Sequence, residues 1–187
     1  MKNFFIITIT AVLIFGIGYF IDSNSLSRPK LTKSNEDQVI NVEMSVPSFK
    51  FLKMDGTFSQ IEDYKGKIVI LNFWATWCAP CVTEFPVILD IISKNKDVVF
   101  IAISNDNDAT EVHKFTQKMR TINAIIDSPQ VVIGLDRERE ISVSSFNVLR
   151  LPETFIINRD FKLVQKVIGS DAWLNGTTEK FLATLKR

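Results

Sequence analysis

The only two cysteines of this 187-residue chain, Cys78 and Cys81, are separated by two residues. Two thiols at this spacing can close into a small disulfide ring and open again, and in doing so they exchange two electrons with another disulfide. The same Cys-x-x-Cys spacing also forms half of a zinc site. The elements that position the pair, and the residues around it, must therefore distinguish redox chemistry from metal binding.

The sequence around the cysteines predicts that Cys78 lies at the start of a helix. A nearly continuous apolar run over residues 68–74 predicts a buried strand, and apolar residues at helical spacing follow the cysteines up to residue 93. Unpaired amides and the dipole at a helix N-terminus favour negative charge, so we expect a lowered pKa for the Cys78 thiol. Cys81, one turn later and covered by the helix, is expected to be the resolving thiol.

Two residues without charge, Ala79 and Pro80, separate the cysteines. Pro80 is tolerated in the first helical turn because its missing N–H had no partner within the helix. Neither residue adds a positive charge that would stabilise the thiolate further, so we expect a reductant rather than a strong oxidant. We expect Trp77 to contact a partner, together with Ala79 and Pro80, and Trp74 to pack in the core.

Residues 71–81, Leu-Asn-Phe-Trp-Ala-Thr-Trp-Cys-Ala-Pro-Cys, closely resemble the active segment of thioredoxin-like proteins. Motifs on both sides, including Glu84-Phe85-Pro86, are similar to those of the membrane-anchored TlpA/ResA/CcmG (DsbE) group of thiol-disulfide oxidoreductases, and TlpA in particular. The resemblance covers about residues 46–185. It implies a domain that reduces selected disulfides during cytochrome c or cytochrome oxidase assembly. The implied partners are an integral membrane electron donor and a disulfide-bearing protein such as apocytochrome c, a copper-assembly protein or an oxidase subunit.

Leu151-Pro152, at the start of Leu-Pro-Glu-Thr-Phe, matches the loop in which this family carries a cis proline facing the active cysteines. A cis X-Pro bond costs little, and a proline without an N–H leaves the backbone groups of Leu151 free to pair with an extended substrate strand. The alternative is a proline that merely opens the following strand.

The chain departs from thioredoxins at Asn72, where those proteins carry a buried aspartate that accepts a proton from the resolving thiol. Asparagine does not titrate, so another base is needed. Glu84 lies three residues after Cys81 on the same helix face and matches an acidic residue of the TlpA/ResA/CcmG group. Burial near a thiol would raise the pKa of Glu84 usefully, whereas a surface glutamate without a role is the alternative.

The N-terminal part of the chain differs in composition from the rest. An apolar run over residues 4–21 has about the length that spans a bilayer. We therefore expect residues 1–21 to anchor the protein in a bacterial inner membrane, residues 22–41 to form a polar tether, and residues 42–187 to form the folded domain in the periplasm. A cleaved signal peptide, which would leave a soluble periplasmic protein, is the alternative.

The remaining pattern predicts an α/β, thioredoxin-like fold. The central mixed β-sheet is expected to carry helices on both faces, in addition to an N-terminal β-hairpin and the membrane-anchor helix. Beyond the active segment, we expect strands at 97–104, 122–126, 153–158 and 162–168, and helices at 109–119, 136–146 and 177–186.

Several other functions fit the sequence less well. A formal charge of +1 with interspersed signs gives no field that attracts nucleic acid. His113, the only histidine, lies in a polar helical stretch and is better interpreted as a solvated residue than as a ligand, so we expect no metal and no cofactor beyond the redox-active disulfide. A non-catalytic or metal-binding assembly factor on the same fold, and an oxidant of protein thiols, remain as alternatives.

Overall fold

The computed structural model of the protein describes residues 39–186. The expected anchor, residues 1–21, and most of the expected tether, residues 22–41, lie outside this range. Within the described range, no helix is both long and apolar enough to cross a membrane. The first strand, β1 (Val39–Ser45), begins before residue 42, where the folded domain was expected to start. The alternation of buried and exposed residues that marks other strands is weak in β1, which is mostly exposed, so only its pairing with β8 defines it.

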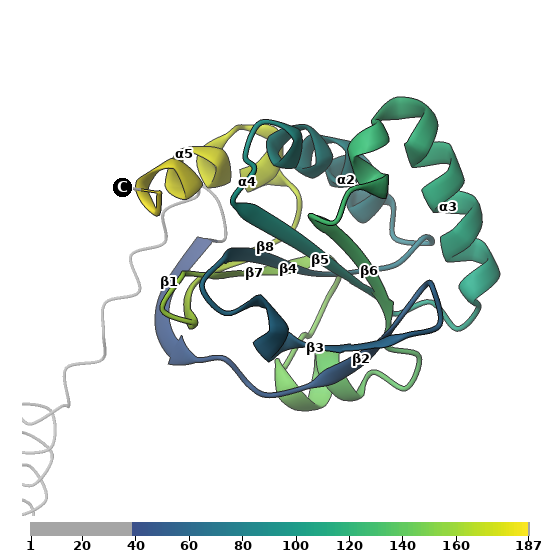
Figure 1. Ribbon diagram of the computed structural model, residues 1–187, viewed down its shortest axis with the longest axis horizontal. Helices are drawn as coiled ribbons and strands as arrows, with labels where there is room; N and C mark the ends of the chain where they lie inside the picture. Colours follow the sequence, from purple (N-terminus) through teal and green to yellow (C-terminus); the bar gives the residue numbers. More distant parts are fainter. Residues whose placement is uncertain (1–38, 187) are drawn as a thin grey trace, which may run out of the picture. The chain divides into compact units, whose positions relative to one another are not determined.

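Eight strands form one mixed sheet in the order β1-β8-β7-β4-β5-β6-β2-β3 (Figure 1). β4 (Ile68–Trp74) lies inside this sheet, parallel to β5 (Val98–Ser104) and antiparallel to β7 (Glu153–Ile157). Every residue of β4 is buried, which explains its continuous apolar run. The other strands are β2 (Lys50–Lys53), β3 (Phe58–Gln60), β6 (Val131–Leu135) and β8 (Lys162–Ile168).

Two apolar cores lie on the two faces of the sheet, and helical segments cover them unequally. One core includes residues of all four α-helices, which lie on one side of the sheet in Figure 1. The opposite core is closed by two shorter segments, the 3₁₀ turn η1 (Ile61–Tyr64) and the π-helical turn η3 (Glu140–Ser145). The mixed sheet with flanking helices is therefore confirmed, but its α-helices share one face. These helices are α2 (Ala79–Ser93), α3 (Ala109–Ile122), α4 (Asp171–Leu174) and α5 (Thr177–Thr184).

The expected N-terminal hairpin is formed by β2 and β3, which pair antiparallel. It joins the main sheet through β6, where the packing leaves no space for a side chain at Gly134. A Cβ atom there would lie 2.5 Å from Cδ2 of Phe51 and 2.9 Å from Cδ1 of Ile103. Glycine in β6 thus allows the hairpin to approach the sheet closely.

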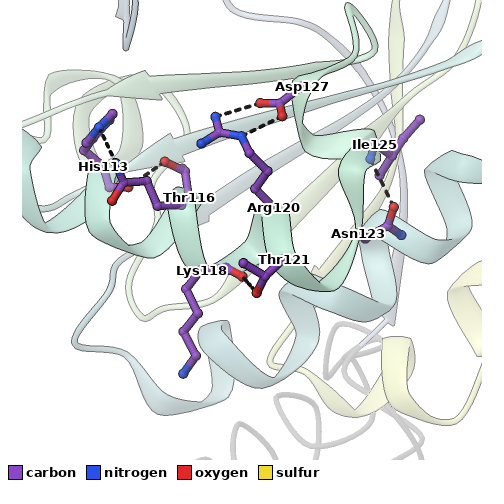
Figure 2. Close-up of polar contacts among 9 residues, drawn as sticks. His113, Thr116, Lys118, Arg120, Thr121, Asn123, Ile125 and Asp127 are labelled. Carbon is purple, nitrogen blue, oxygen red and sulfur yellow. Dashed lines mark hydrogen bonds and ion pairs between the residues drawn. The ribbon is translucent and has the colours of Figure 1, made fainter.

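The prediction of a strand at residues 122–126 is wrong. Instead, α3 ends at Ile122 and is followed by the 3₁₀ turn η2 (Ala124–Asp127). Asn123 starts this turn by accepting a hydrogen bond from the Ile125 amide at 3.1 Å, and Arg120 holds it against α3 through hydrogen bonds of 2.6 and 2.8 Å to Asp127 (Figure 2). The local side-chain contacts therefore outweigh the β-propensity of these residues, and the strand of this region is β6.

The helix predicted at residues 136–146 is present only as the π-helical turn η3. Its carboxylate cap is Asp136, which accepts hydrogen bonds from the amides of Ile141 at 3.1 Å and Ser142 at 2.7 Å. Arg139, with a φ of 56°, occupies the left-handed region just before the turn. This positive φ interrupts any helix that would start at residue 136.

Candidate active site

The two cysteines form a disulfide at the N-terminus of α2. Cys78 is the N-cap residue, and its sulfur accepts a hydrogen bond from the amide of Cys81 at 3.3 Å. Cys78 is 7% exposed, whereas Cys81 is fully buried. Cys78 is therefore the more accessible of the two cysteines, and it lies where the helix N-terminus favours a thiolate.

The loop that leads into the helix is held by a buried carboxylate, Asp106. The backbone N–H of Thr76 donates to Oδ2 of Asp106 at 2.9 Å, and the Thr76 hydroxyl donates to Oδ1 at 2.6 Å. The hydroxyl of Ser104 donates to the same carboxylate at 2.6 Å. The role of Asp106 was not predicted from the sequence. The available signal was an aspartate two residues after a buried strand that could neighbour the strand before the cysteines.

A second buried carboxylate, Glu84, lies on α2 one turn after Cys81. Nδ2 of Asn72 donates to Oε1 of Glu84 at 2.9 Å and to the hydroxyl of Thr154 at 2.9 Å. Oε2 of Glu84 has no hydrogen-bond partner among the described residues. Burial raises the pKa of Glu84 to about 8, and the hydrogen bond from Asn72 opposes this rise only in part. A carboxyl group with such a pKa can both accept and release a proton near neutral pH.

The peptide bond between Leu151 and Pro152 is cis. Pro152 immediately precedes Glu153, which pairs with Phe73 near the C-terminal end of β4. The loop to Cys78 leaves the sheet at this same end, so the topology brings the proline and the cysteines to one edge of the fold. The carbonyl of Pro152 accepts a hydrogen bond from the Gly169 amide at 2.9 Å, which ties the loop to β8.

Glu153 is the third buried carboxylate near the site. Its Oε2 forms an ion pair with Nζ of Lys166 at 2.6 Å, and its Oε1 accepts a hydrogen bond from the amide of Leu149 at 3.3 Å. It thereby connects the chain before the cis proline to β8. Glu153 belongs to the Leu-Pro-Glu-Thr-Phe motif, and this role was not predicted from the sequence.

A cavity of about 250 Å³ lies beside the disulfide loop and the proline loop. Trp77, which is 63% exposed, and Leu151 both line it. Ala79 and Pro80 are exposed at the start of α2. Trp74, by contrast, is fully buried, and its ring packs against Phe85 and Phe115. The structure thus brings Trp77, which precedes Cys78, and Leu151, which precedes Pro152, to one cavity.

His113 lies elsewhere, on the exposed side of α3. Its ring forms a hydrogen bond of 3.1 Å with the side-chain amide of Gln117, in the area drawn in Figure 2. Between residues 39 and 186, no three His, Cys, Asp or Glu side chains are grouped so that they could hold a metal ion.

Sequence comparison places this arrangement among known proteins. The family model described as Redoxin matches residues 41–181. The thiol-disulfide oxidoreductase ResA of Bacillus subtilis (strain 168) is 31% identical over 164 residues, which cover 87% of this chain and 82% of the relative. The protein of the same name from Geobacillus kaustophilus (strain HTA426) is 29% identical over 164 residues, which cover 87% and 84%.

Structural comparison shows the thioredoxin-like fold. A crystal structure of a thiol:disulfide interchange protein DsbE from Chlorobium tepidum has a TM-score of 0.66 and 23% identity, and the match covers 78% of this chain and 99% of that one. A secreted Mycobacterium tuberculosis disulfide oxidoreductase homologous to E. coli DsbE matches with a TM-score of 0.53 and 21% identity, over 63% of this chain and 81% of that one.

Proposed function

This chain belongs to the Redoxin family and is a thiol-disulfide oxidoreductase of the TlpA/ResA/CcmG type, and from that membership we propose that it reduces disulfides in other proteins. The observation that carries the proposal is the position of Cys78, whose sulfur accepts the Cys81 amide at the head of α2 while Cys81 itself is buried. In the reduced protein the helix N-terminus stabilises a Cys78 thiolate. The neutral Ala79-Pro80 pair adds no cationic side chain, which supports the reducing direction.

The proposed cycle has two exchange steps. The Cys78 thiolate attacks one sulfur of the substrate disulfide, which forms a mixed disulfide and releases the other substrate sulfur as a thiolate. The thiol of Cys81 then loses its proton and attacks the Cys78 sulfur, which releases the second substrate sulfur. Two electrons pass to the substrate, the two released thiolates take up protons, and the protein ends with the Cys78–Cys81 disulfide.

Glu84 is proposed to accept the proton of Cys81. Its pKa of about 8 lies close to the usual value of about 8.5 for a thiol, so the proton can move between the two groups at little cost. Asn72 holds one carboxyl oxygen of Glu84 through a hydrogen bond of 2.9 Å and leaves the other without a partner among the described residues. The free oxygen is the one proposed to receive the proton.

The surface around Cys78 is proposed to dock the substrate. The cis bond before Pro152 leaves the backbone groups of Leu151 for an extended strand of the substrate. Trp77, Ala79 and Pro80 are exposed beside Cys78 and supply contact area on its other side. We propose no metal and no cofactor beyond the disulfide itself.

Location and partners follow as further parts of this proposal. Residues 1–21 anchor the chain in a bacterial inner membrane and hold the domain in the periplasm, where an integral membrane electron donor reduces it again. The substrate belongs to cytochrome c or cytochrome oxidase assembly, as an apocytochrome c, a copper-assembly protein or an oxidase subunit. The apolar run at residues 4–21 and the similarity to the ResA proteins support this assignment.

Trapping the mixed disulfide tests the proposed function. A Cys81→Ser variant of the full chain, expressed in cells, should accumulate disulfide-linked to its substrate, because the resolving thiol is missing. The bands should disappear on reduction and should be absent in a Cys78→Ser control. Equal bands in both variants, or none in the first, would contradict the cycle.

The redox potential tests the direction of electron flow. A value near that of thioredoxin, about −270 mV, supports reduction, whereas one near that of DsbA, about −120 mV, would make the protein an oxidant.

A further inference from the structure

The cavity beside the disulfide has an unusual charge balance. Arg139 and Arg150 both line it, and no Asp or Glu does. Among residues 39–186, neither guanidinium group takes part in an ion pair or a side-chain hydrogen bond. Two arginines thus line one small cavity, and neither has a negative partner in the described part of the chain.

The neighbouring buried carboxylates do not pair with the two arginines, because they accept hydrogen bonds from backbone amides. Asp136, which is 6% exposed, accepts hydrogen bonds from the Ile141 and Ser142 amides, and so fixes the turn that follows Arg139. Glu153, which is 2% exposed, holds the Leu149 amide and pairs with Lys166. Both arginine-bearing segments are therefore fixed while their charged ends stay unpaired.

The exposed acidic residues nearest in sequence are Glu138 and Glu140, which flank Arg139. Neither lines the cavity, and neither forms an ion pair with an arginine of the described chain. The guanidinium group of Arg139 is therefore free of direct contact with the two carboxylates that flank it in the described structure.

Apolar side chains gather at the same cavity. Eight large hydrophobic side chains are exposed in the described part of the chain, and three of them line it: Trp77 at 63%, Val143 at 47% and Leu149 at 82%. Such clustering marks a contact surface, whereas single exposed apolar residues need no explanation. The cavity thus offers apolar contact area next to two free guanidinium groups.

We propose that this cavity selects substrates in which an acidic residue and an apolar residue lie next to the disulfide. The inference rests on the proposed function and specifies its substrate. Carboxylates match the planar donor fork of arginine, so an Asp or Glu of the substrate pairs with Arg139 or Arg150 while its apolar neighbour packs on Trp77 and Leu149. Since Leu151 lines the cavity and Trp77 precedes Cys78, a strand docked along the proline loop carries the residues that flank its disulfide into this space.

Three peptides test this selection. Each contains one internal disulfide in the same sequence, with Glu, Gln or Lys at the two flanking positions. The full chain is reduced, freed of reductant and mixed with each peptide, and single-turnover reduction is followed by separating reduced from oxidised peptide. We expect the Glu peptide to react about fivefold faster than the Gln peptide, and the Lys peptide to react slowest. The difference should shrink as salt is added.

Charge-reversal variants assign the preference to the two arginines. The double variant Arg139→Glu/Arg150→Glu should reverse the order of the three peptides. Arg150→Lys, which keeps the charge, should keep the order, and Arg150→Gln provides a milder variant if the double variant does not fold. Arg137→Glu is the matched control, because Arg137 is exposed on the same loop and does not line the cavity. The ratio of the peptide rates is the readout, since a change in general thiol reactivity leaves it constant.

Two results would overturn the inference, and they can be told apart. Equal reduction of all three peptides, or a Glu preference that survives the double reversal, would remove the selection and leave the proposed reductase intact. Failure to reduce the peptides and also the small uncharged hydroxyethyl disulfide would remove the proposed function, and the selection with it.

Discussion

The helices α2 and α3 each follow one of two neighbouring parallel strands, β4 and β5. The two helices differ in the group that accepts a hydrogen bond from their first free amides. In α3, the carboxylate of Asp108 accepts the Thr110 amide at 2.8 Å. In α2, the sulfur of Cys78 accepts the Cys81 amide at 3.3 Å. A carboxylate caps its helix permanently, whereas a sulfur becomes a charged cap only when the disulfide is reduced. One helix start therefore serves stability and the other serves the thiolate.

The loops before the two helices also differ in whether they contribute a buried carboxylate. The loop after β5 places Asp106 in the interior, where it binds Thr76 of the loop after β4. The loop after β4 contributes no carboxylate in return. The loop before α3 thus holds the loop before α2 in place through Asp106, and the loop before α2 carries the cysteine that exchanges disulfides.

Removing the sulfur cap should have the largest effect. Cys78→Ser should lower peptide disulfide reduction to the uncatalysed background, because no thiolate remains at the head of α2. Serine is a good N-cap, so the variant should melt close to the reduced wild-type protein. Activity is measured with the peptides described above and melting by circular dichroism. Retained activity would show that Cys78 is not the attacking thiol.

Replacing Glu84 should change the pH dependence of stability. The pKa of Glu84 is raised from 4.5 to about 8, so the folded protein binds a proton that the unfolded chain has lost in this range. The stability contributed by the neutral group is full below about 4.5 and falls by about 1.4 kcal/mol per pH unit up to about 8. Glu84→Gln should remove this fall.

Urea unfolding of the oxidised protein between pH 5 and pH 9 measures the effect as a difference in slope. The pH–rate profile of peptide reduction should also lose its inflection near 8 in Glu84→Gln. Parallel stability curves for the two proteins would show that Glu84 is ionised in the folded state at neutral pH.

Weakening the link between the two loops should have an intermediate effect. Asp106→Asn replaces an acceptor of several hydrogen bonds by a group that must also donate, so the Thr76 loop loses part of its support. We expect stability to fall by about 1–3 kcal/mol and peptide reduction to slow by about tenfold. Stopped-flow kinetics at saturating peptide separates slower chemistry from weaker binding. An unchanged rate with lowered stability would restrict Asp106 to a structural role.

Breaking the carboxylate cap of α3 should have the smallest effect. Asp108→Ala leaves the Thr110 amide without its acceptor, which should lower the melting temperature by about 3 °C. Peptide reduction should stay at the wild-type rate, because the cap does not contact the loop that carries the cysteines. A clear loss of activity would show that the two helix starts are coupled.

Elements with a strong local signal could be predicted from the sequence. The apolar runs of β4 and β5 and the hairpin of β7 and β8 were located because their own residues show the pattern. β6 was missed, because its place depends on pairing with β5 and β2. The nearby run at residues 122–126 has the residue types of a strand, and only the contacts of Asn123 and Arg120 show that it forms a turn.

The residues of the candidate site also divide into those that could be predicted from a local motif and those that depend on long-range pairing. Cys78, Cys81, Glu84 and Pro152 stand in short motifs, so their positions could be predicted, and the comparisons confirm the oxidoreductase class. The buried carboxylate of Asp106 could not, because its partner Thr76 lies 30 residues earlier and reaches it only through the pairing of β4 with β5. The cavity with its two arginines likewise arises from loops that are distant in the chain.

The hydrogen bond between Asn72 and Thr154 joins residues 82 positions apart. During synthesis, both thiols therefore leave the ribosome long before the strand that completes the buried polar cluster. Until that strand arrives, the glutamate at position 84 remains hydrated and titrates as an ordinary carboxylic acid. Proton transfer between Glu84 and the resolving sulfur thus requires the completed sheet.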